Sequence, residues 1–158
     1  MAAFCIANHF KVEPELAMAA ISAYVPGMNR SQVVHSGSNT LILDAYNANP
    51  SSMKAAIDNF THLKADNKIL ILGDMFELGP DSPAEHRAIL DLIAQHQYLK
   101  VITAGPIFCQ VAEGHINVEC YATTGDLKEA LTKNPLHDST ILIKGSRGMK
   151  METIVDIL

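Results

Sequence analysis

The stretch LILDAYNANPSS, residues 41–52, predicts a junction between a buried strand and a helix. Its first three residues are apolar, and the carboxylate of Asp44 follows them directly. Asn49 stands before Pro50, and a residue before proline is pushed toward extended backbone. An extended Asn is a good helix N-cap, and proline is common in the first turn of a helix. We therefore expect the strand to end near Asp44 and a helix to begin at Pro50.

Strand-like and helix-like segments alternate on both sides of this junction. Residues 1–26 have a helical pattern with Pro14 in a first turn, and residues 31–35 and 39–46 have the pattern of a hairpin. Further strands are predicted at 68–72, 100–103, 117–121 and 140–144, and helices at 50–64, 83–97, 106–113, 125–133 and 151–158. Because most strands are continuous apolar runs, we predict an α/β fold. It has a mostly parallel sheet, helices on both faces, an antiparallel hairpin near the start and an N-terminal helical segment.

The helix predicted at 83–97 carries a recognisable start. Ser82 and Glu85, around Pro83, have the spacing of a capping box. His86 lies inside the same helix, where a packing or hydrogen-bonding role is favoured over a catalytic one.

Composition excludes several functional classes. The 158 residues are 48% hydrophobic and 18% charged, which is typical of a globular domain rather than a disordered chain. The formal net charge is -5 and no block of Lys or Arg occurs, so neither nucleic acid nor an anionic membrane is an expected partner. The apolar runs are far shorter than the roughly 18 residues of a membrane span, so membrane insertion is not expected.

Cysteine and histidine spacing predicts neither disulfides nor a metal site. Cys5, Cys109 and Cys120 are widely separated and form no CxxC pair. Buried, reduced thiols are the simplest interpretation, and they suit a cytoplasmic protein. The seven histidines form no HxxxH or HExxH pair, so we expect no metal ligands in this chain.

Polar residues follow three of the predicted strands, at residues 44–49, 73–79 and 144–148. In an open α/β sheet, ligands bind outside the carboxyl ends of the strands. The three segments should therefore meet at one edge. The glycines of the third allow close backbone approach to a ligand, and Arg147 can grip a carboxylate or phosphate. Neither GxGxxG nor GxxxxGK[ST] occurs, so the usual dinucleotide and triphosphate cradles are missing from these 158 residues.

Each of these polar residues also has a purely structural interpretation. Asp44 and Asn49 can simply cap a helix, and Asp74 can cap a turn. Glu77 can be a solvated charge, and Lys144 can be an ordinary surface cation beside a flexible loop.

Three motifs together resemble the C-terminal domain of the Mur ligases. They are DAYNANPSSMKAAI at 44–57, LGDMFELG at 72–79, followed by His86, and LIKGSRGMKME at 142–152. The resemblance covers residues 29–158, while residues 1–28 are similar to the last helix of the central ATPase domain with its linker. Within the family, the motifs are most similar to those of the members that join D-Ala-D-Ala to UDP-N-acetylmuramoyl-tripeptide.

The resemblance implies a cytoplasmic three-domain ligase. Its first domain binds the UDP-muramoyl peptide, and its central domain holds ATP and Mg²⁺ through a P-loop and a carbamylated lysine. Its third domain, Rossmann-like in shape, closes over the site. The peptide carboxylate is activated as an acyl phosphate, which the incoming amine attacks. Because this chain resembles only the third domain, we expect it to be inactive alone, to contain no catalytic residue and to bind no cofactor tightly.

The resemblance also implies roles for individual residues. Asp44 matches the acid that holds the ATP ribose, and Arg30 matches an arginine near the phosphates. The charge of Arg147 suits the dipeptide carboxylate. The nucleotide-binding residues expected are Arg30, Asp44, Tyr46, Asn47 and Asn49. The dipeptide-binding residues expected are Asp74, Glu77, Lys144, Ser146 and Arg147.

Two alternatives belong to other functional classes. Asp44, Asp74 and Lys144 imitate the layout of a receiver-type signalling domain, although no adjacent acid pair follows the first strand and glycine rather than proline follows Lys144. The chain can also be a stand-alone small-molecule binding module. Phosphorylation by acetyl phosphate with magnesium would favour the first alternative, and a natural gene encoding only this chain would favour the second.

Overall fold

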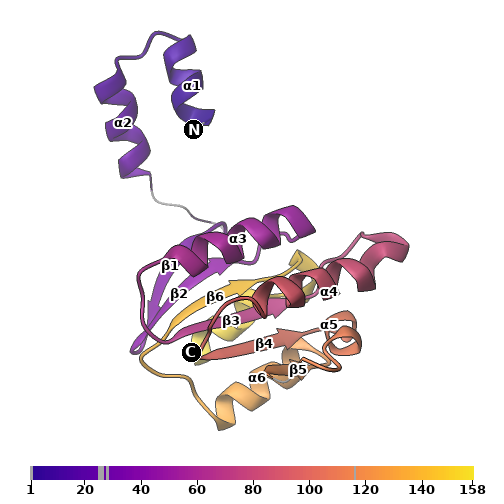
Figure 1. Cartoon of the computed structure of the whole chain (residues 1–158). Coiled ribbons are helices and arrows are strands. Elements are labelled where there is room, and N and C mark those ends of the chain that lie inside the picture. The colour runs from indigo at the N-terminus through magenta and orange to yellow at the C-terminus, as the bar shows by residue number, and fades with distance from the viewer. Residues whose placement is uncertain (1, 25–26, 28, 116) are drawn as a thin grey trace.

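A six-stranded sheet forms the centre of the molecule in a computed structural model that describes residues 2–24, 27, 29–115 and 117–158. The strand order is β1-β2-β6-β3-β4-β5, with β1 antiparallel to β2 and the other neighbours parallel (Figure 1). The strands are β1 (Gln32–Ser36), β2 (Asn39–Asp44), β3 (Lys68–Gly73), β4 (Lys100–Ala104), β5 (Val118–Tyr121) and β6 (Thr140–Lys144). The predicted mostly parallel sheet with one antiparallel hairpin is confirmed.

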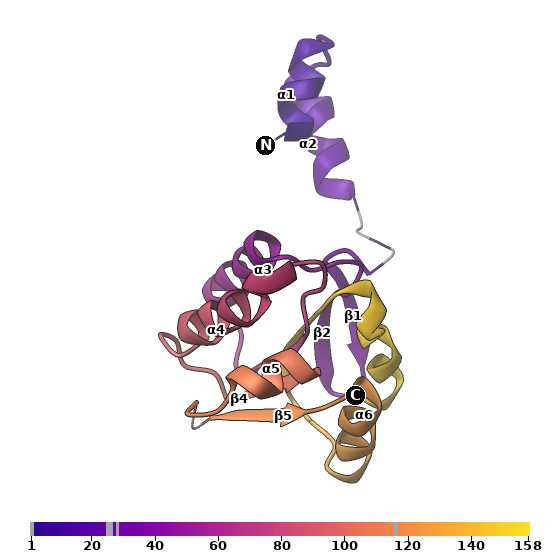
Figure 2. The ribbon, with the colours of Figure 1, turned by 90° about the vertical axis from the view of Figure 1, so that its right-hand side faces the viewer.

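Helices cover both faces of this sheet, as Figure 2 shows end-on. One face carries α3 (Pro50–His62), α4 (Ser82–Ile93) and α5 (Pro106–Val111), and the other carries α6 (Thr124–Lys133) and the 3₁₀ segment η3 (Met151–Ile157). Successive strand residues point to opposite faces. Ile69 and Ile71 therefore pack under α6 and η3, while Leu70 and Leu72 pack under α3 and α4. All four are buried, which explains the continuous apolar strand sequences.

The N-terminal segment forms two helices rather than one continuous run. They are α1 (Ala2–His9) and α2 (Pro14–Ala23), with Lys11 in the left-handed region at φ 57° between them. Pro14 is the first residue of α2, as expected. The two helices pack against each other and stand clear of the sheet in both views (Figures 1 and 2). Pro26, the last residue of the predicted helical pattern, lies outside the described residues.

One predicted helix cap is wrong, and one predicted helix differs in its winding. No capping box forms around Ser82, because Asp81 occupies the N-cap position with helical backbone and makes no side-chain cap bond. The Ser82 carbonyl accepts a hydrogen bond from the Nδ1–H of His86, at 2.7 Å. The C-terminal segment has the apolar spacing expected of an α-helix, but it winds as 3₁₀ helix, with Met151 and Ile154 buried against the sheet.

The cysteine prediction is also wrong. Cys109 on α5 and Cys120 on β5 form a disulfide, and Cys5 is exposed rather than buried. The pairing arises because α5 packs on β5, which brings the two Cα atoms to 5.4 Å, within the range that a disulfide spans. None of the described helices combines the length and the apolar character needed to cross a bilayer.

Candidate functional site

The three polar segments meet at one edge of the sheet, as predicted. β6 lies between β2 and β3, and Lys144 is in register with Asp44 on one side and with Leu72 on the other. The loops that leave these three strands therefore begin side by side. This follows from the crossover of α3, which carries the chain from β2 past the position of β6 to β3.

Asp44 and Lys144 form an ion pair at this edge. The Lys144 Nζ lies 2.6 Å from the Asp44 Oδ2 and also donates to the Asn47 carbonyl at 3.1 Å. The second Asp44 oxygen accepts from the backbone N–H of Ser31 at 3.2 Å. The Lys144 side chain is 2% exposed and that of Asp44 is 21% exposed. Lys144 is thus an internal cation that fixes the loop after β2. In this arrangement two of the donors of its ammonium are engaged inside the domain.

The predicted cap at Asn49 is present. Asn49 has extended backbone at φ -141°, and its side-chain oxygen accepts from the Ser52 N–H at 2.9 Å. The Ser52 hydroxyl in turn accepts from the Asn49 N–H at 3.1 Å, which completes a capping box. Because the Asn49 side chain is engaged in this way, its contribution to the edge is to orient the start of α3. The Asn47 side chain is engaged locally as well, accepting from the Ala48 N–H at 2.9 Å.

Asp74 is a buried anchor for α5. Its side chain is fully buried, and its two oxygens accept from the N–H groups of Phe108 at 2.9 Å and Ile107 at 3.0 Å. A carboxylate at a helix start is stabilised by these free N–H groups. Gly105, at φ +123°, allows this approach, since a Cβ there would collide with the Asp74 carboxylate. The structural interpretation of Asp74 is therefore favoured over the predicted dipeptide contact.

His86 is a neutral internal connector. Its Nε2 accepts from the Met75 N–H at 2.9 Å and its Nδ1 donates to the Ser82 carbonyl at 2.7 Å. An Nε2 that accepts a hydrogen bond carries no proton, so its 3.6 Å approach to the Asp74 Oδ1 is not an ion pair. The fully buried ring also packs edge-on against Phe108. The predicted packing and hydrogen-bonding role is confirmed.

Ser146 joins the loops after β2, β3 and β6. Its hydroxyl accepts from the Phe76 N–H at 2.8 Å and lies 3.4 Å from the Ala48 carbonyl. Its own N–H donates to the Asp74 carbonyl at 3.0 Å. The residue is only 3% exposed, so its polar groups hold the edge together rather than project from it. Of the five predicted dipeptide residues, Glu77 and Arg147 alone are exposed.

A pocket of about 250 Å³ opens at this edge. It is lined by Tyr46, Asn47, Phe76, Glu77, Ser146, Arg147 and Gly148. Two guanidiniums lie against the Tyr46 ring, with the Arg30 Cζ 4.0 Å and the Arg147 Cζ 5.4 Å from its centroid. These distances are within the range of cation–π contacts. Glu77, at φ 64°, holds a left-handed conformation at the rim, and strained backbone of this kind clusters at functional sites.

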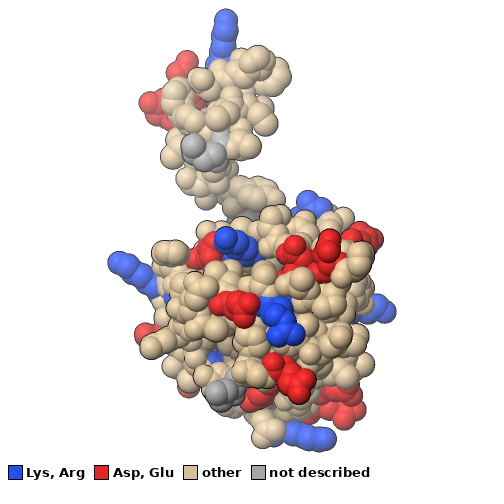
Figure 3. Space-filling model, turned by 45° about the vertical axis from the view of Figure 1, so that its right-hand side comes forward, with Lys and Arg blue, Asp and Glu red and all other residues tan. Residues whose placement is uncertain are grey.

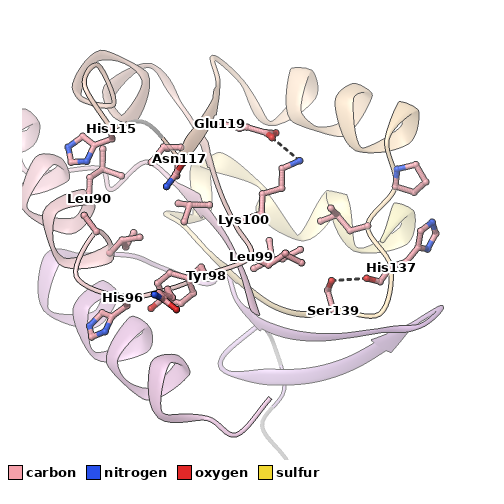
Figure 4. Close-up of a pocket in the computed structure, with 18 residues that line it drawn as sticks. Leu90, His96, Tyr98, Leu99, Lys100, His115, Asn117, Glu119, His137 and Ser139 are labelled. Atoms are coloured by element: carbon pink, nitrogen blue, oxygen red, sulfur yellow. Dashed lines mark hydrogen bonds and ion pairs between the residues drawn. The ribbon is translucent and has the colours of Figure 1, made fainter. Parts of the chain in front are cut away.

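A larger hollow of about 1060 Å³ lies at the opposite ends of the strands (Figure 4). It includes His96, Tyr98 and Leu99 before β4, together with the ion pair between Lys100 and Glu119 at 2.9 Å. Size favours this hollow, but position does not, since ligands of open α/β sheets bind at the carboxyl ends. The sequence motifs also lie at the carboxyl ends. The smaller pocket is therefore the candidate functional site.

The face shown in Figure 3 carries no concentrated patch of Lys and Arg side chains. Blue and red side chains are interspersed over the face shown in Figure 3, and most of the surface of the helical pair on that face is uncharged. The described residues hold no group of three or more His, Cys, Asp or Glu side chains placed to share a metal ion.

The residues at the edge are chemically suited to part of a nucleotide. A carboxylate offers about four lone-pair sites, and Asp44 uses two of them internally, which leaves acceptors for ribose hydroxyls. In the described part of the chain, neither Arg30 nor Arg147 pairs with an acidic side chain, so both guanidiniums are available to an anion. No GxGxxG or GxxxxGK[ST] loop occurs in the 158 residues, so a nucleotide at this edge would need phosphate contacts from elsewhere.

Comparison with known proteins identifies the family. The family model described as Mur ligase, glutamate ligase domain, matches residues 29–147. The chain belongs to this family. This Mur ligase domain is 36% identical to the UDP-N-acetylmuramoyl-tripeptide–D-alanyl-D-alanine ligase of Bacillus subtilis (strain 168), over 98% of the chain and 36% of that protein. It is 36% identical to the ligase of the same name from Treponema pallidum (strain Nichols), over 84% of the chain and 30% of that protein.

Solved structures agree. A crystal structure of MurF from Acinetobacter baumannii superimposes on this Mur ligase domain with a TM-score of 0.80 and 25% identity. The superposition covers 94% of the 158-residue chain and 34% of that structure's chain. The domain thus spans about a third of the length of the relatives it matches. Family membership disfavours the receiver alternative. So does the burial of Asp74, because a fully buried carboxylate is not accessible to a phosphate donor in solution.

Proposed function

We propose that this chain is the C-terminal domain of a cytoplasmic, ATP-dependent ligase that adds D-Ala-D-Ala to UDP-N-acetylmuramoyl-tripeptide. This reaction belongs to peptidoglycan synthesis, and through it to cell-wall growth, cell shape and cell division. The observation that carries the proposal is the meeting of three family motifs at one sheet edge, around a pocket lined by the exposed Arg147, with Arg30 against the Tyr46 ring. The ligases of Bacillus subtilis and Treponema pallidum, each matched over most of this chain, support it.

In this proposal the edge completes a site whose other half lies on other domains. ATP and Mg²⁺ are held mainly by those domains, and Asp44 receives the ribose while Arg30 approaches the phosphates. Arg147 and Glu77 face the incoming dipeptide. Asp74, Lys144 and Ser146 shape the edge from inside, because all three are buried. The chain alone catalyses no ligation, and its contribution is to position substrates and neutralise charge.

The boundary within the chain supports the same proposal. Residues 1–28 are proposed to be the end of the central ATPase domain with its linker, and residues 29–158 the C-terminal domain. α1 has no buried residue and α2 buries only Ala17. The large apolar side chains Phe10, Leu16 and Met18 are 55% to 73% exposed. Helices this exposed need a further surface to pack against, and a central domain supplies one.

The proposal is tested by kinetics on the full-length reading frame. Asp44→Ala removes hydrogen bonds to a charged acceptor, so the KM for ATP should rise about tenfold to a hundredfold. Arg147→Ala should raise the KM for D-Ala-D-Ala. Asp91→Ala is the control, because this carboxylate is 62% exposed on α4, outside the pocket. An unchanged KM for ATP in Asp44→Ala would show that the ribose assignment is wrong, and wild-type protein without ligase activity would contradict the proposed function itself.

A further inference from the structure

Tyr46 contacts both of the arginines to which the family resemblance gives different substrates. The Arg30 Cζ is 4.0 Å and the Arg147 Cζ 5.4 Å from its ring centroid, so the two guanidiniums are no farther apart than the sum of these distances. Arg30 precedes β1 and Arg147 follows β6, which places them 117 positions apart in the sequence. A single aromatic ring thus gathers two cations from remote segments.

The backbone around Arg30 is built to hold this position. The Tyr46 N–H donates to the Asn29 carbonyl at 3.2 Å, and the Ser31 N–H donates to the Asp44 carboxylate at 3.2 Å. Asn29 and Ser31 have φ angles of 58° and 49°, so both residues next to Arg30 occupy the left-handed region. Non-glycine residues adopt this conformation at a cost, and such positions cluster at functional sites. Arg30 is therefore held on the ring by its neighbours on both sides.

Neither guanidinium is neutralised by the described part of the chain. The described residues place no carboxylate within 4.0 Å of Arg30 or Arg147, and no hydrogen bond from either side chain is formed to them. Asp44 is the nearest acid in sequence to Tyr46, and it is already paired with Lys144. Two neighbouring cations repel each other, and the face of an aromatic ring offsets only part of that repulsion. Both guanidiniums are exposed, so an anion from outside the described residues can reach them.

We propose that Tyr46 is a positioning residue that holds Arg30 and Arg147 as one oxyanion-binding site. Both guanidiniums then act on the same ligand group, instead of one acting on the nucleotide and the other on the dipeptide. The ligand chemistry is a phosphoryl or carboxylate oxyanion, which arginine grips in bidentate fashion. The identity of the natural anion rests on the proposed function, but the existence of the site does not.

Binding to the 158-residue chain tests this site without any ligase assay. The probes are inorganic pyrophosphate and D-Ala-D-Ala, each titrated by calorimetry at low ionic strength. The affinity for the probe that binds should fall about tenfold in Arg30→Ala and also in Arg147→Ala, since each substitution removes a charged hydrogen-bond donor. Tyr46→Leu should lower the affinity for the same probe about fivefold. Tyr46→Phe keeps the ring and should bind the probe like the wild type. The probe that responds identifies the source of the oxyanion.

The chain contains its own control for these measurements. Arg30, Arg87 and Arg147 are its three arginines, and Arg87 lies exposed on α4. The Nε–H signals of Arg30 and Arg147 should show ring-current shifts that Tyr46→Leu abolishes and Tyr46→Phe preserves, with Arg87 unchanged. Arg87→Ala should leave binding unaltered. The inference is overturned if each arginine affects only its own probe, if neither probe binds wild type at millimolar concentration, or if folded Tyr46→Leu binds like wild type. A full-length protein without ligase activity would leave these results intact and would count against the proposed function alone.

Discussion

Replacing Lys144 tests whether the ion pair beneath the pocket organises the domain. The Lys144 side chain is 2% exposed and its ammonium lies 2.6 Å from the carboxylate of Asp44. Removing one partner of a buried pair costs about 3–5 kcal/mol, because the other charge is left without compensation. Asp44 keeps 21% exposure and the Ser31 N–H bond, so we expect about 2–3 kcal/mol for Lys144→Met, which retains the apolar stem.

The reverse replacement should cost more. Asp44→Asn leaves the ammonium of Lys144 buried, and the lysine has almost no access to water. We therefore expect Asp44→Asn to lower the free energy of unfolding by about 3–5 kcal/mol. The double variant should recover about 1–2 kcal/mol of the summed loss, because it removes both charges together. Urea unfolding followed by far-ultraviolet circular dichroism measures these values in a chain without tryptophan. Additive effects, or losses below about 0.5 kcal/mol, would refute the reasoning.

Three further results are expected. Asp74→Ala should destabilise the domain by about 2–4 kcal/mol and accelerate amide hydrogen exchange in α5, because two N–H groups of that helix lose a charged acceptor. Unchanged exchange in α5 would contradict the role of Asp74 as an anchor of that helix. The double variant Cys109→Ser, Cys120→Ser should lose about 3 kcal/mol of unfolding free energy relative to the oxidised chain, since the disulfide closes a loop of 11 positions. Its stability should match that of the reduced wild type. A reductant that leaves urea unfolding of the wild type unchanged would contradict the disulfide. Burial raises the pKa of Tyr98 above 10.0, so the folded state holds this proton more tightly and stability should fall as pH rises through the raised pKa. Tyr98→Phe should reduce that fall, as measured by urea midpoints on either side of the tyrosinate absorbance transition.

Local chemistry explains why much of the fold was predictable. The order of strands and helices follows from apolar runs and helical spacing, which depend on neighbours in sequence. The Asn49 cap was predictable because extended backbone before proline and an amide side chain act within four residues. The Ser82 capping box is absent because of another local feature of the chain. The preceding turn η1 (Gly79–Asp81) leads straight into α4, so Ser82 is already helical. Apolar spacing alone also could not separate α from 3₁₀ winding in η3.

The sequence by itself determined the family motifs, the parallel sheet and the edge at which polar residues collect. Those features follow from residue order, since the carboxyl ends of parallel strands always share one edge. Only the tertiary structure decided which of the polar residues face the pocket. Lys144 turns inward because β6 lies between β2 and β3, where its ammonium meets Asp44 and the Asn47 carbonyl. Asp74 turns inward because its carboxylate meets the free N–H groups at the start of α5. Tertiary contacts also joined Cys109 to Cys120 and placed Arg30 and Arg147 on one ring, because contacts between remote segments leave no trace in local spacing.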